Sequence, residues 1–369
     1  MSKQKLIRVG LVGVGNWATY GHIPALKLLP QYQIVAVCSR SIEKAKSIAE
    51  EFKIAHAFSR VDDLVNLPDV DLVVVLSPAP EHARIVKAAI GAGKDVYCEW
   101  PLTTNTQDSE ELLRLAETAG VRHFVGLQRT LGASSLHLSQ LIRERYIGDI
   151  RSVRMHVSMG SFGPTRSASL EWTLPAGNFS HVLSIYGGHF MDMLFHALGK
   201  PEMLNGIVAT QFPMLTLAST GREYPNETPD AFMVMGRLAG GALFQIQIEG
   251  GKQNLGGLQI EITGTLGDIK VMNERAFVTK HHDVIEAALG DKGAWASLLL
   301  PCSTKLIPCS DLDSSVEDLA QLYAAFESDR RTGGTTVRTF ADAVELHRII
   351  DAINTSSRSG RSVSLMGER

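Results

Sequence analysis

The sequence has no marked charge imbalance, no basic run and no long apolar segment. Its 36 Lys and Arg residues against 39 Asp and Glu give a formal net charge of −3, which offers no electrostatic reason to expect nucleic acid or an anionic membrane as a partner. No apolar run approaches the roughly 18 residues that a membrane helix needs, and the N-terminus lacks the apolar core of a signal peptide. We therefore expect a cytoplasmic protein without a membrane-spanning segment.

Cysteine is also scarce. The chain has four, Cys38, Cys98, Cys302 and Cys309, with no CxxC spacing and no disulfide-framework density. Buried thiols in a reducing compartment are the expected state, and their spacing predicts no metal site.

The length predicts two domains. A chain of 369 residues, 44% hydrophobic and 20% charged, has the composition of a soluble globular protein and exceeds the roughly 150 residues typical of one domain. The alternation of continuous apolar strands with helices ends near Gln128. This change predicts a first domain of residues 1–127 and a second of residues 128–369.

A glycine-rich turn near the N-terminus is the most informative stretch. The apolar run Ile7–Val12 predicts a strand, and a helix-compatible segment follows at 23–29. Gly13 permits a sharp turn, Gly15 lets the backbone approach a pyrophosphate, and Ala18 allows the helix to pack closely on the strand. This order of strand, turn and helix predicts a dinucleotide site with the helix N-terminus facing the phosphates.

Further apolar strands alternate with helices up to residue 127. Predicted strands at 34–38, 72–76, 95–98 and 123–127 give an α/β domain with a doubly wound parallel sheet of five strands. Ligands of such sheets bind beyond the carboxyl ends of the strands. The predicted cofactor-binding residues are Gly13, Gly15, Asn16, Trp17, Ala18, Ser39, Arg40, Ser77, Pro78, His82, Glu99, Trp100, Pro101 and Gln128.

The end of the second strand bears on the choice of cofactor. An acidic residue there bonds the ribose hydroxyls of NAD, whereas a hydroxyl and an arginine accept the 2′-phosphate of NADP. Ser39 and Arg40 stand at this place, so NADP(H) is favoured over NAD(H). The alternative is that Arg40 is an ordinary solvated cation.

The pattern after residue 128 is that of a different domain. Three segments alternate strictly between apolar and polar residues, which predicts an α+β domain with a large open sheet, mainly antiparallel and polar on one face. These segments are 151–159, 244–249 and 258–263. We expect a bridging helix at about 134–146 and an amphipathic last helix at about 339–355 that packs back on the first domain. The stretch 285–308 shows no assignable pattern.

The segment GGHFMDMLFH, at 187–196, places ionisable residues on one stripe of an apolar helix. His189, Asp192 and His196 fall at i, i+3 and i+7. Three interpretations stay open: a catalytic pair with His196 as general base and Asp192 as its partner, a satisfied structural network, or a metal site. The metal site is least favoured, because no further cluster of ligands completes a coordination shell.

Substrate contacts are predicted near this helix and the crevice. The segment 161–182 is rich in Gly, Pro and Ser, and a loop of that length in a compact domain is usually functional or mobile. The candidate residues are Trp100, Arg129, Trp172, Asn178, Tyr186 and His189.

Several motifs resemble those of a known family. They are GLVGVGNWA, SPAPEH (77–82), AGKDVYCEWPL (92–102), GGHFMDMLFH, ITGTLGDIKV (262–271) and GRSVSL (360–365), and they are similar to the glucose-fructose oxidoreductase / inositol dehydrogenase / MocA family along nearly the whole chain. The resemblance implies an N-terminal Rossmann domain and a C-terminal domain whose open sheet pairs in homodimers or homotetramers. It also implies hydride transfer between NAD(P) and a sugar, inositol or related polyol or keto substrate, with His196 as the catalytic histidine.

Two departures from the family pattern define a second hypothesis. The family's Glu-Lys-Pro is Glu-Trp-Pro at 99–101, and Trp100 cannot exchange a proton near neutral pH. One extra residue also lies between Gly15 and His22. Both features resemble the branch that contains the yeast galactose-regulon co-repressor, which implies a non-catalytic NAD(P)-binding sensor. We favour the oxidoreductase because the family's catalytic histidine is retained as His196.

Overall fold

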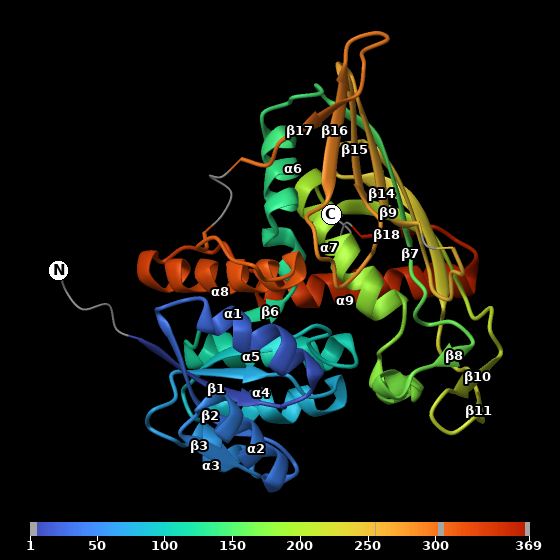
Figure 1. Cartoon of the computed structure of the whole chain (residues 1–369). Coiled ribbons are helices and arrows are strands. Elements are labelled where there is room, and N and C mark those ends of the chain that lie inside the picture. The colour runs from blue at the N-terminus through green and yellow to red at the C-terminus, as the bar shows by residue number, and fades with distance from the viewer. Residues whose placement is uncertain (1–5, 255, 302–305, 366–369) are drawn as a thin grey trace. The chain divides into compact units, whose positions relative to one another are not determined.

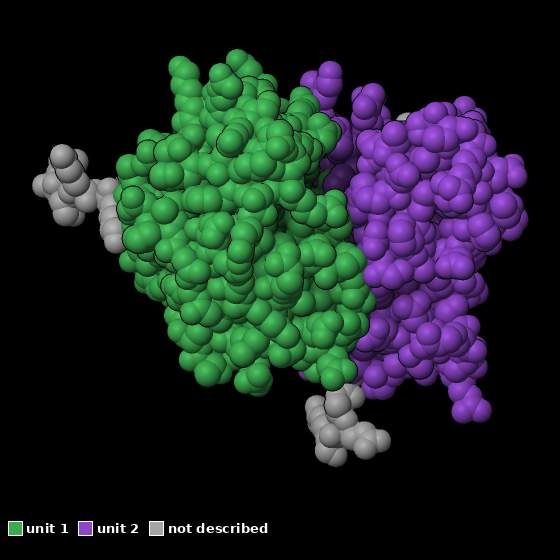
Figure 2. All heavy atoms as spheres, turned by 90° about the horizontal axis from the view of Figure 1, so that it is seen from below, with its two compact units in different colours: residues 1–131, 305–345 green, residues 132–304, 346–369 purple. Residues whose placement is uncertain are grey.

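The computed structural model describes residues 6–254, 256–301 and 306–365 (Figure 1). It divides into two compact units, coloured separately in Figure 2: unit 1 is residues 1–131 with 305–345, and unit 2 is residues 132–304 with 346–369. These two units are defined by contacts in space. The division into 1–127 and 128–369 is instead a division along the chain, and it stays a prediction. None of the described helices is long and apolar enough to cross a membrane.

Unit 1 contains a six-stranded parallel sheet with the order β3-β2-β1-β4-β5-β6. The chain order reverses between β1 and β4, which is the switch point where doubly wound sheets bind ligands. The strands are β1 (Ile7–Val12), β2 (Tyr32–Cys38), β3 (His56–Phe58), β4 (Leu72–Val75), β5 (Asp95–Glu99) and β6 (His123–Gly126). The helices are α1 (Ile23–Lys27), α2 (Ile42–Phe52), α3 (Val61–Val65), α4 (His82–Gly91), α5 (Thr106–Ala119) and α8 (Ser314–Thr332).

The predicted doubly wound sheet is confirmed, but the expected number of five strands is wrong by one. The prediction omits β3, which has only three residues and none that is fully buried. The apolar run that marks the inner strands is absent there, because an edge strand is buried less than a central one. It also omits α8, which adds a helix from near the C-terminus to unit 1.

Polar side chains set the ends of the helices beside the sheet. Ser41 caps α2 by accepting the N–H of Lys44 at 3.1 Å. Asn105 caps α5 in the same way through the N–H of Asp108 at 2.8 Å. Gly120, at φ +66°, ends α5 in the left-handed conformation.

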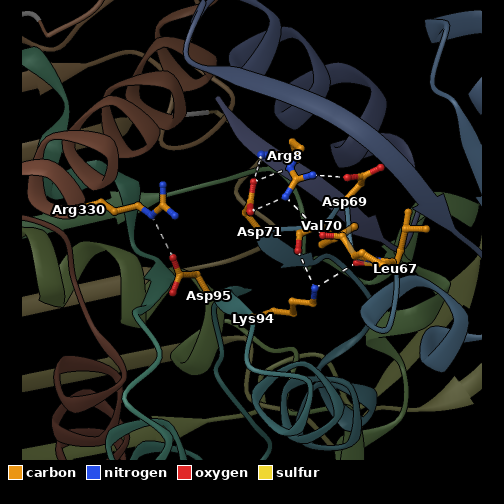
Figure 3. A network of polar contacts seen from close by, with 9 residues as sticks. Arg8, Leu67, Asp69, Val70, Asp71, Lys94, Asp95 and Arg330 are labelled. Atoms are coloured by element: carbon orange, nitrogen blue, oxygen red, sulfur yellow. Dashed lines mark hydrogen bonds and ion pairs between the residues drawn. The ribbon is translucent and has the colours of Figure 1, made fainter. Parts of the chain in front are cut away.

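Ion pairs hold the amino ends of the parallel strands (Figure 3). Arg8 of β1 binds both carboxylate oxygens of Asp71, at 2.9 and 3.0 Å, and Lys94 donates to two carbonyls of the turn before β4, at 3.1 and 2.8 Å. Arg330 of α8 pairs with Asp95 at 3.4 Å. These contacts lie at the edge opposite to the one that binds ligands in sheets of this type.

Unit 2 contains a nine-stranded sheet with the order β17-β16-β15-β14-β7-β13-β12-β9-β18 and a small sheet with the order β11-β10-β8. The large sheet consists of β7 (Ile150–Ser158), β9 (Pro201–Ala209), β12 (Ala231–Leu238), β13 (Leu243–Glu249), β14 (Gly257–Gly264), β15 (Gly267–Asn273), β16 (Val284–Leu289), β17 (Ala296–Leu298) and β18 (Val363–Ser364). The small sheet consists of β8 (Thr165–Arg166), β10 (Met214–Leu217) and β11 (Arg222–Pro225).

The predicted large, mainly antiparallel sheet is confirmed, with one exception at its centre. β7 and β13 run parallel, because the chain leaves β7 through a long excursion before β13 instead of a tight turn. Strict alternation of apolar and polar residues fits either direction, so this pairing was not readable from the pattern. One face is buried through residues such as Val153, Met155 and Val157 of β7.

Three helices belong wholly or partly to unit 2. They are α6 (Ala133–Arg143), α7 (Gly188–Leu198) and the part of α9 (Phe340–Ser359) that follows residue 345. α9 packs on β9, where the N–H of Gly206 donates to Ser356 Oγ at 3.0 Å. The stretch 285–308, which had no predicted structure, contains most of β16 and all of β17; its residues 302–305 lie outside the described residues.

Candidate functional site

The glycine-rich turn of unit 1 requires glycine at its first position. Gly13 follows β1 at φ +103°, and a Cβ there would lie 2.8 Å from the carbonyl carbon of Leu76. Its N–H donates to the carbonyl of Cys38, at the end of β2, at 2.9 Å. Gly13 therefore holds the ends of β1, β2 and β4 together at the switch point.

Gly15, in contrast to Gly13, has open space where a side chain would begin. A Cβ on Gly15 would have nothing within 4 Å, so no neighbouring atom of the described chain excludes a side chain there. Its carbonyl accepts the N–H groups of Ala18 and Thr19, at 3.1 and 3.3 Å, which starts the helical turn. This leaves open space in front of a helix start, where a pyrophosphate would meet backbone N–H groups.

The extra residue of this turn is accommodated as a π-helical turn. Residues Ala18–His22 form one π turn before α1, and a π turn is how an inserted residue is commonly absorbed in a helix. Gly21 makes it possible, because a Cβ there would lie 2.7 Å from the indole of Trp17. The π turn leads directly into α1, which begins at Ile23.

Two buried polar atoms at the carboxyl edge of the sheet have no hydrogen-bond partner among the described residues. They are Ser77 Oγ, which follows β4, and Gln128 Oε1, which follows β6. Buried polar groups in proteins are nearly always satisfied, so two orphaned atoms on one edge indicate a polar ligand. Together with the space at Gly15, they fit a dinucleotide bound along this edge.

His82 holds two loops of this edge. Its Nε2 is 2.6 Å from the carbonyl of Ser77, and its Nδ1 is 2.9 Å from the carbonyl of Pro101. Burial lowers the pKa of His82, against the raising effect of those two carbonyls. With 1% of its surface exposed, His82 positions the loops and has little surface for a cofactor contact.

Glu99, the last residue of β5, accepts three hydrogen bonds on one oxygen. The donors to Oε1 are Trp17 Nε1 at 3.2 Å, His22 Nε2 at 2.8 Å and the Tyr97 hydroxyl at 2.5 Å. His22 Nδ1 in turn lies 2.7 Å from the hydroxyl of Tyr323 on α8. This network joins the π turn, β5 and α8.

The remaining predicted cofactor residues differ in exposure. Ser39 is partly exposed and Arg40 exposed, after β2, and the Arg40 side chain has no hydrogen bond or ion pair to any described residue. Asn16 and Pro78 are exposed, whereas Trp100 is buried with 5% of its surface accessible. Trp100 therefore acts mainly as packing at the end of β5, and Arg129, also predicted as a substrate contact, is buried with 8% exposed.

In unit 2, α7 forms as predicted. Its three ionisable residues differ in how much of their surface is exposed to solvent. His189 and Asp192 are buried, with 5% and 3% of their surfaces exposed, whereas His196 is exposed in the last turn. Asp192 and His196 are four residues apart and so share one side of the helix. Among the described residues, no group of three His, Cys, Asp or Glu side chains is placed to hold a metal ion.

The other predicted substrate residues of unit 2 lie before α7. Trp172 is 42% exposed, and its carbonyl accepts a hydrogen bond from the Asn178 side chain. Tyr186 is partly exposed; its hydroxyl lies 3.1 Å from Ser161 Oγ, and burial raises its pKa. Tyr186 and His189 each meet the ring of Phe277, at 5.1 Å between centroids.

Several residues that contact the site could not be found from the sequence. His22 and Tyr97 donate to Glu99, Tyr323 lies against His22, and Phe277 packs against Tyr186. Tyr97 lies in a quoted motif, but nothing in that motif indicates its contact with Glu99. Their partners are up to 301 residues away in the chain. Periodicity places a residue on a face of its own element and carries no information on such distant pairs.

The comparisons with known proteins agree with this architecture. Residues 7–127 match the model of an oxidoreductase family with an NAD-binding Rossmann fold, and residues 135–273 match the model of the Gal80p C-terminal domain. Residues 7–127 thus match the NAD-binding domain of the glucose-fructose oxidoreductase / inositol dehydrogenase / MocA family. The predicted resemblance is confirmed, and unit 1 contains the family's NAD(P)-binding Rossmann fold.

The proteins to which the chain is similar include both dehydrogenases and regulators. The chain is 28% identical to "Dehydrogenase aclE" of Aspergillus oryzae, over 98% of each chain, and 26% identical to "scyllo-inositol 2-dehydrogenase (NADP(+)) IolW" of Bacillus subtilis, over 98% of this chain and 97% of that protein. It is 27% identical to the galactose/lactose metabolism regulatory protein GAL80 of Saccharomyces cerevisiae, over 73% of this chain and 68% of that protein.

Solved structures show the same fold. A super-repressor mutant of Gal80p from Saccharomyces cerevisiae gives a TM-score of 0.86 at 24% identity, covering 98% of each chain. Levoglucosan dehydrogenase in complex with NADH and levoglucosan also gives a TM-score of 0.86, at 23% identity, covering 98% of this chain and all of the other. The fold is therefore shared by a regulator and an enzyme.

Proposed function

We propose that the protein is an NAD(P)-dependent oxidoreductase that transfers a hydride between the nicotinamide and a sugar, inositol or related polyol or keto substrate. The observation that carries this proposal is the exposed His196 on the same side of α7 as the buried Asp192. A protein that only binds a cofactor needs no exposed acid–base group on that helix. The two dehydrogenase relatives also align with nearly the whole chain.

The residues of each unit take separate roles in the proposed reaction. In unit 1, the turn at Gly13 and Gly15 binds the pyrophosphate, and Ser77 and Gln128 bind polar groups of the cofactor through their orphaned oxygens. The bound nicotinamide supplies hydride transfer. In unit 2, His196 exchanges the proton of the substrate hydroxyl, and Asp192 orients it. Tyr186 and His189 are the proposed contacts to the substrate.

The test of this proposal is turnover. Purified protein is incubated with NADP⁺ or NAD⁺ and aldoses, inositols, sugar acids and polyols, and with NADPH or NADH and the matching keto compounds, while nicotinamide absorbance is followed. We expect turnover with at least one substrate. Tight cofactor binding without turnover on the whole panel contradicts the proposal and supports the second candidate, a non-catalytic NAD(P)-binding regulator. The match of residues 135–273 to the Gal80p C-terminal domain favours that candidate.

For the cofactor we propose NADP(H). The exposed guanidinium of Arg40, without a partner among the described residues, is available to a 2′-phosphate, and Ser39 offers no carboxylate to repel it. Replacing Arg40 by Ala is expected to weaken NADPH binding about tenfold, at the typical strength of a charge-assisted hydrogen bond, and to leave NADH binding unchanged. Equal loss for both cofactors, measured by calorimetric titration, contradicts this preference.

We also propose that the protein forms a homodimer or homotetramer through the open face of the nine-stranded sheet. Apolar side chains on this face that are exposed by 46–63% include Ile207, Met233, Met235 and Leu243. Beside them lies a groove of about 420 Å³ that contains Arg154 and Lys270 as well as Glu261. A face with apolar residues and both signs of charge is complementary to a second copy of itself.

A further inference from the structure

Arg166 is a buried cation of unit 2 to which the proposed reaction gives no role. It ends β8, in the small sheet, and 2% of its surface is exposed. Its Nη1 donates to the carbonyl of Gly163 at 3.0 Å, which is the one hydrogen bond between its side chain and the described residues. Nε is buried and has no partner in the described part of the chain. Because a guanidinium carries five N–H donors, most of its donors find no acceptor there.

The charge of Arg166 is retained, and no described carboxylate pairs with it directly. Burial lowers the pKa of Arg166 to about 10, against the raising effects of Asp230 and Tyr186, so the side chain is cationic at neutral pH. The Asp230 carboxylate is occupied elsewhere: it accepts the main-chain N–H groups of Gln211 and Phe212, at 2.9–3.0 Å. A buried cation whose donors lack acceptors is costly, which indicates a site for an anion.

The ring of Phe162 holds the guanidinium in place. Cζ of Arg166 lies 4.7 Å from the centroid of this ring, which is a cation–π contact. Phe162 is 3% exposed and has a left-handed backbone, at φ +60°, a conformation that is strained for a bulky residue. Strain of this kind concentrates at ligand sites. The backbone conformation of Phe162 and the unfilled donors of Arg166 therefore indicate the same place.

Phe162 also connects Arg166 to the proposed substrate contacts. Tyr186 meets the ring of Phe162 edge-on, at 5.5 Å between centroids, and its hydroxyl lies 3.1 Å from Ser161 Oγ. Ser161 and Tyr186 are both partly exposed, so solvent reaches the residues next to the guanidinium. Tyr186 lies in a π turn, Leu183–Gly187, that runs directly into α7, and π turns are frequent at functional sites.

We propose that Arg166 binds a carboxylate of the substrate, which makes that substrate a sugar acid rather than a neutral sugar or inositol. This inference rests on the proposed function, because it takes Tyr186 as a substrate contact. A planar guanidinium matches a carboxylate through two parallel hydrogen bonds. Nε and Nη2 donate these two bonds, while Nη1 stays on the carbonyl of Gly163. The carboxylate reaches them past the partly exposed Ser161 and Tyr186.

The experiment compares the binding of paired ligands and needs no turnover. Calorimetric titration, with and without NADP⁺, gives the affinities of glucuronate against glucose, galacturonate against galactose and gluconate against glucitol. We expect the parent to prefer at least one acid about 10- to 100-fold over its neutral partner, at the usual strength of a charged hydrogen bond. Arg166→Gln is expected to lose this preference, and Arg166→Lys, which keeps the charge without the planar fork, to retain part of it.

Arg222→Gln is the matched control and is expected to keep the parent's preference. Arg222 also lies over an aromatic ring in the small sheet, that of Tyr224 at 4.9 Å, but it is exposed. A purely structural role for Arg166 lowers the affinity for acids and neutral sugars equally, and this result contradicts the inference.

The other results separate the inference from the proposed function. A parent that prefers no acid, or that binds glucose 6-phosphate or acetate more tightly than every sugar acid, shows that the inference is wrong while the proposed function stands. A preference for acids that depends on Arg166, without turnover of any substrate in the panel, supports the carboxylate site and contradicts the oxidoreductase. The Arg166→Lys protein and the ligand pairs on the parent keep the test independent of the folding of Arg166→Gln.

Discussion

At the scale of single residues, Gly13 and Gly15 occupy one turn but are glycine for different reasons. Gly13 needs a positive φ and has main-chain atoms 2.8 Å from a would-be Cβ, whereas Gly15 has open space around it. The fold requires the first glycine, and we propose that the ligand requires the second. The sequence motif names both residues but cannot separate these two requirements.

The two glycines therefore predict opposite outcomes for the same substitution. Gly13→Ala is expected to lower the free energy of unfolding by at least about 1–3 kcal/mol, the usual cost of a strained backbone. Gly15→Ala is expected to leave stability nearly unchanged and to weaken cofactor binding at least tenfold. Urea unfolding and calorimetric titration measure the two effects. Unchanged cofactor affinity in a folded Gly15→Ala protein contradicts the placement of the pyrophosphate.

His196 is the residue on which the proposed chemistry depends. Replacing it by Ala is expected to lower kcat roughly 10²- to 10⁴-fold, which is the usual loss of one acid–base group, with little change in cofactor affinity. His281, also exposed in unit 2, is the control, and its replacement by Ala is expected to leave kcat unchanged. A His196→Ala protein as active as the parent removes His196 from this role.

At the scale of elements, the sequence predicts the helices and strands that follow a repeating pattern of apolar residues. It does not predict elements that are too short to show a pattern, or contacts between segments that are distant in the chain. The strands β1, β2, β4, β5 and β6 and the helix α7 follow from apolar runs and helical spacing. β3 is too short to show a pattern of apolar residues. The π turn is visible in the sequence only as one residue more than the family pattern has between Gly15 and His22. The contact between Tyr323 of α8 and His22 joins segments 301 residues apart, and no local signal encodes it.

Buried histidines predict acid sensitivity of the elements that hold them. Burial lowers the pKa of His181, before α7, and of His347, on α9, from 6.5 to about 4. Because these folded-state values are below the unfolded one, the stability that they contribute is present above pH 6.5 and is lost as pH falls toward 4. The expected loss at pH 5 is about 2 kcal/mol for each histidine.

Urea unfolding at pH 7.5 and pH 5 measures this loss. His347→Phe keeps an aromatic ring beside Phe179, which stacks on His347 with centroids 5.5 Å apart, and removes one titrating group. Its unfolding free energy is expected to depend on pH less steeply than that of the parent. An equal slope in both proteins contradicts the assignment of His347 as a buried neutral group.

At the scale of the whole molecule, the fold class was readable because each domain type repeats one pattern many times. Continuous apolar strands between helices specify a parallel sheet covered on both faces, and alternating strands specify a sheet with one polar face. The direction of β13 against β7 was not readable, since alternation does not encode it. The exposed apolar patch at Ile207 and Met235 was likewise hidden, because strand partners must be known before a patch can be located.

That patch makes the proposed assembly testable. Met235→Arg introduces a charge at a site that is 59% exposed, and it is expected to convert the dimer or tetramer into a smaller species. Leu266→Arg, at a residue 62% exposed in the turn between β14 and β15, is the control and is expected to change nothing. Light scattering after size-exclusion chromatography gives the mass. A monomeric parent protein contradicts the assembly.

Hydride transfer within the bound complex is the central claim, and one isotope measurement tests it most directly. The protein is mixed with NADP⁺ and a sugar or inositol deuterated at the reacting carbon, and the nicotinamide is analysed by mass spectrometry after a single turnover. We expect deuterium on the nicotinamide with the parent protein and its loss with His196→Ala. Cofactor that binds tightly yet stays free of deuterium with every substrate of the panel would contradict hydride transfer and identify a regulator.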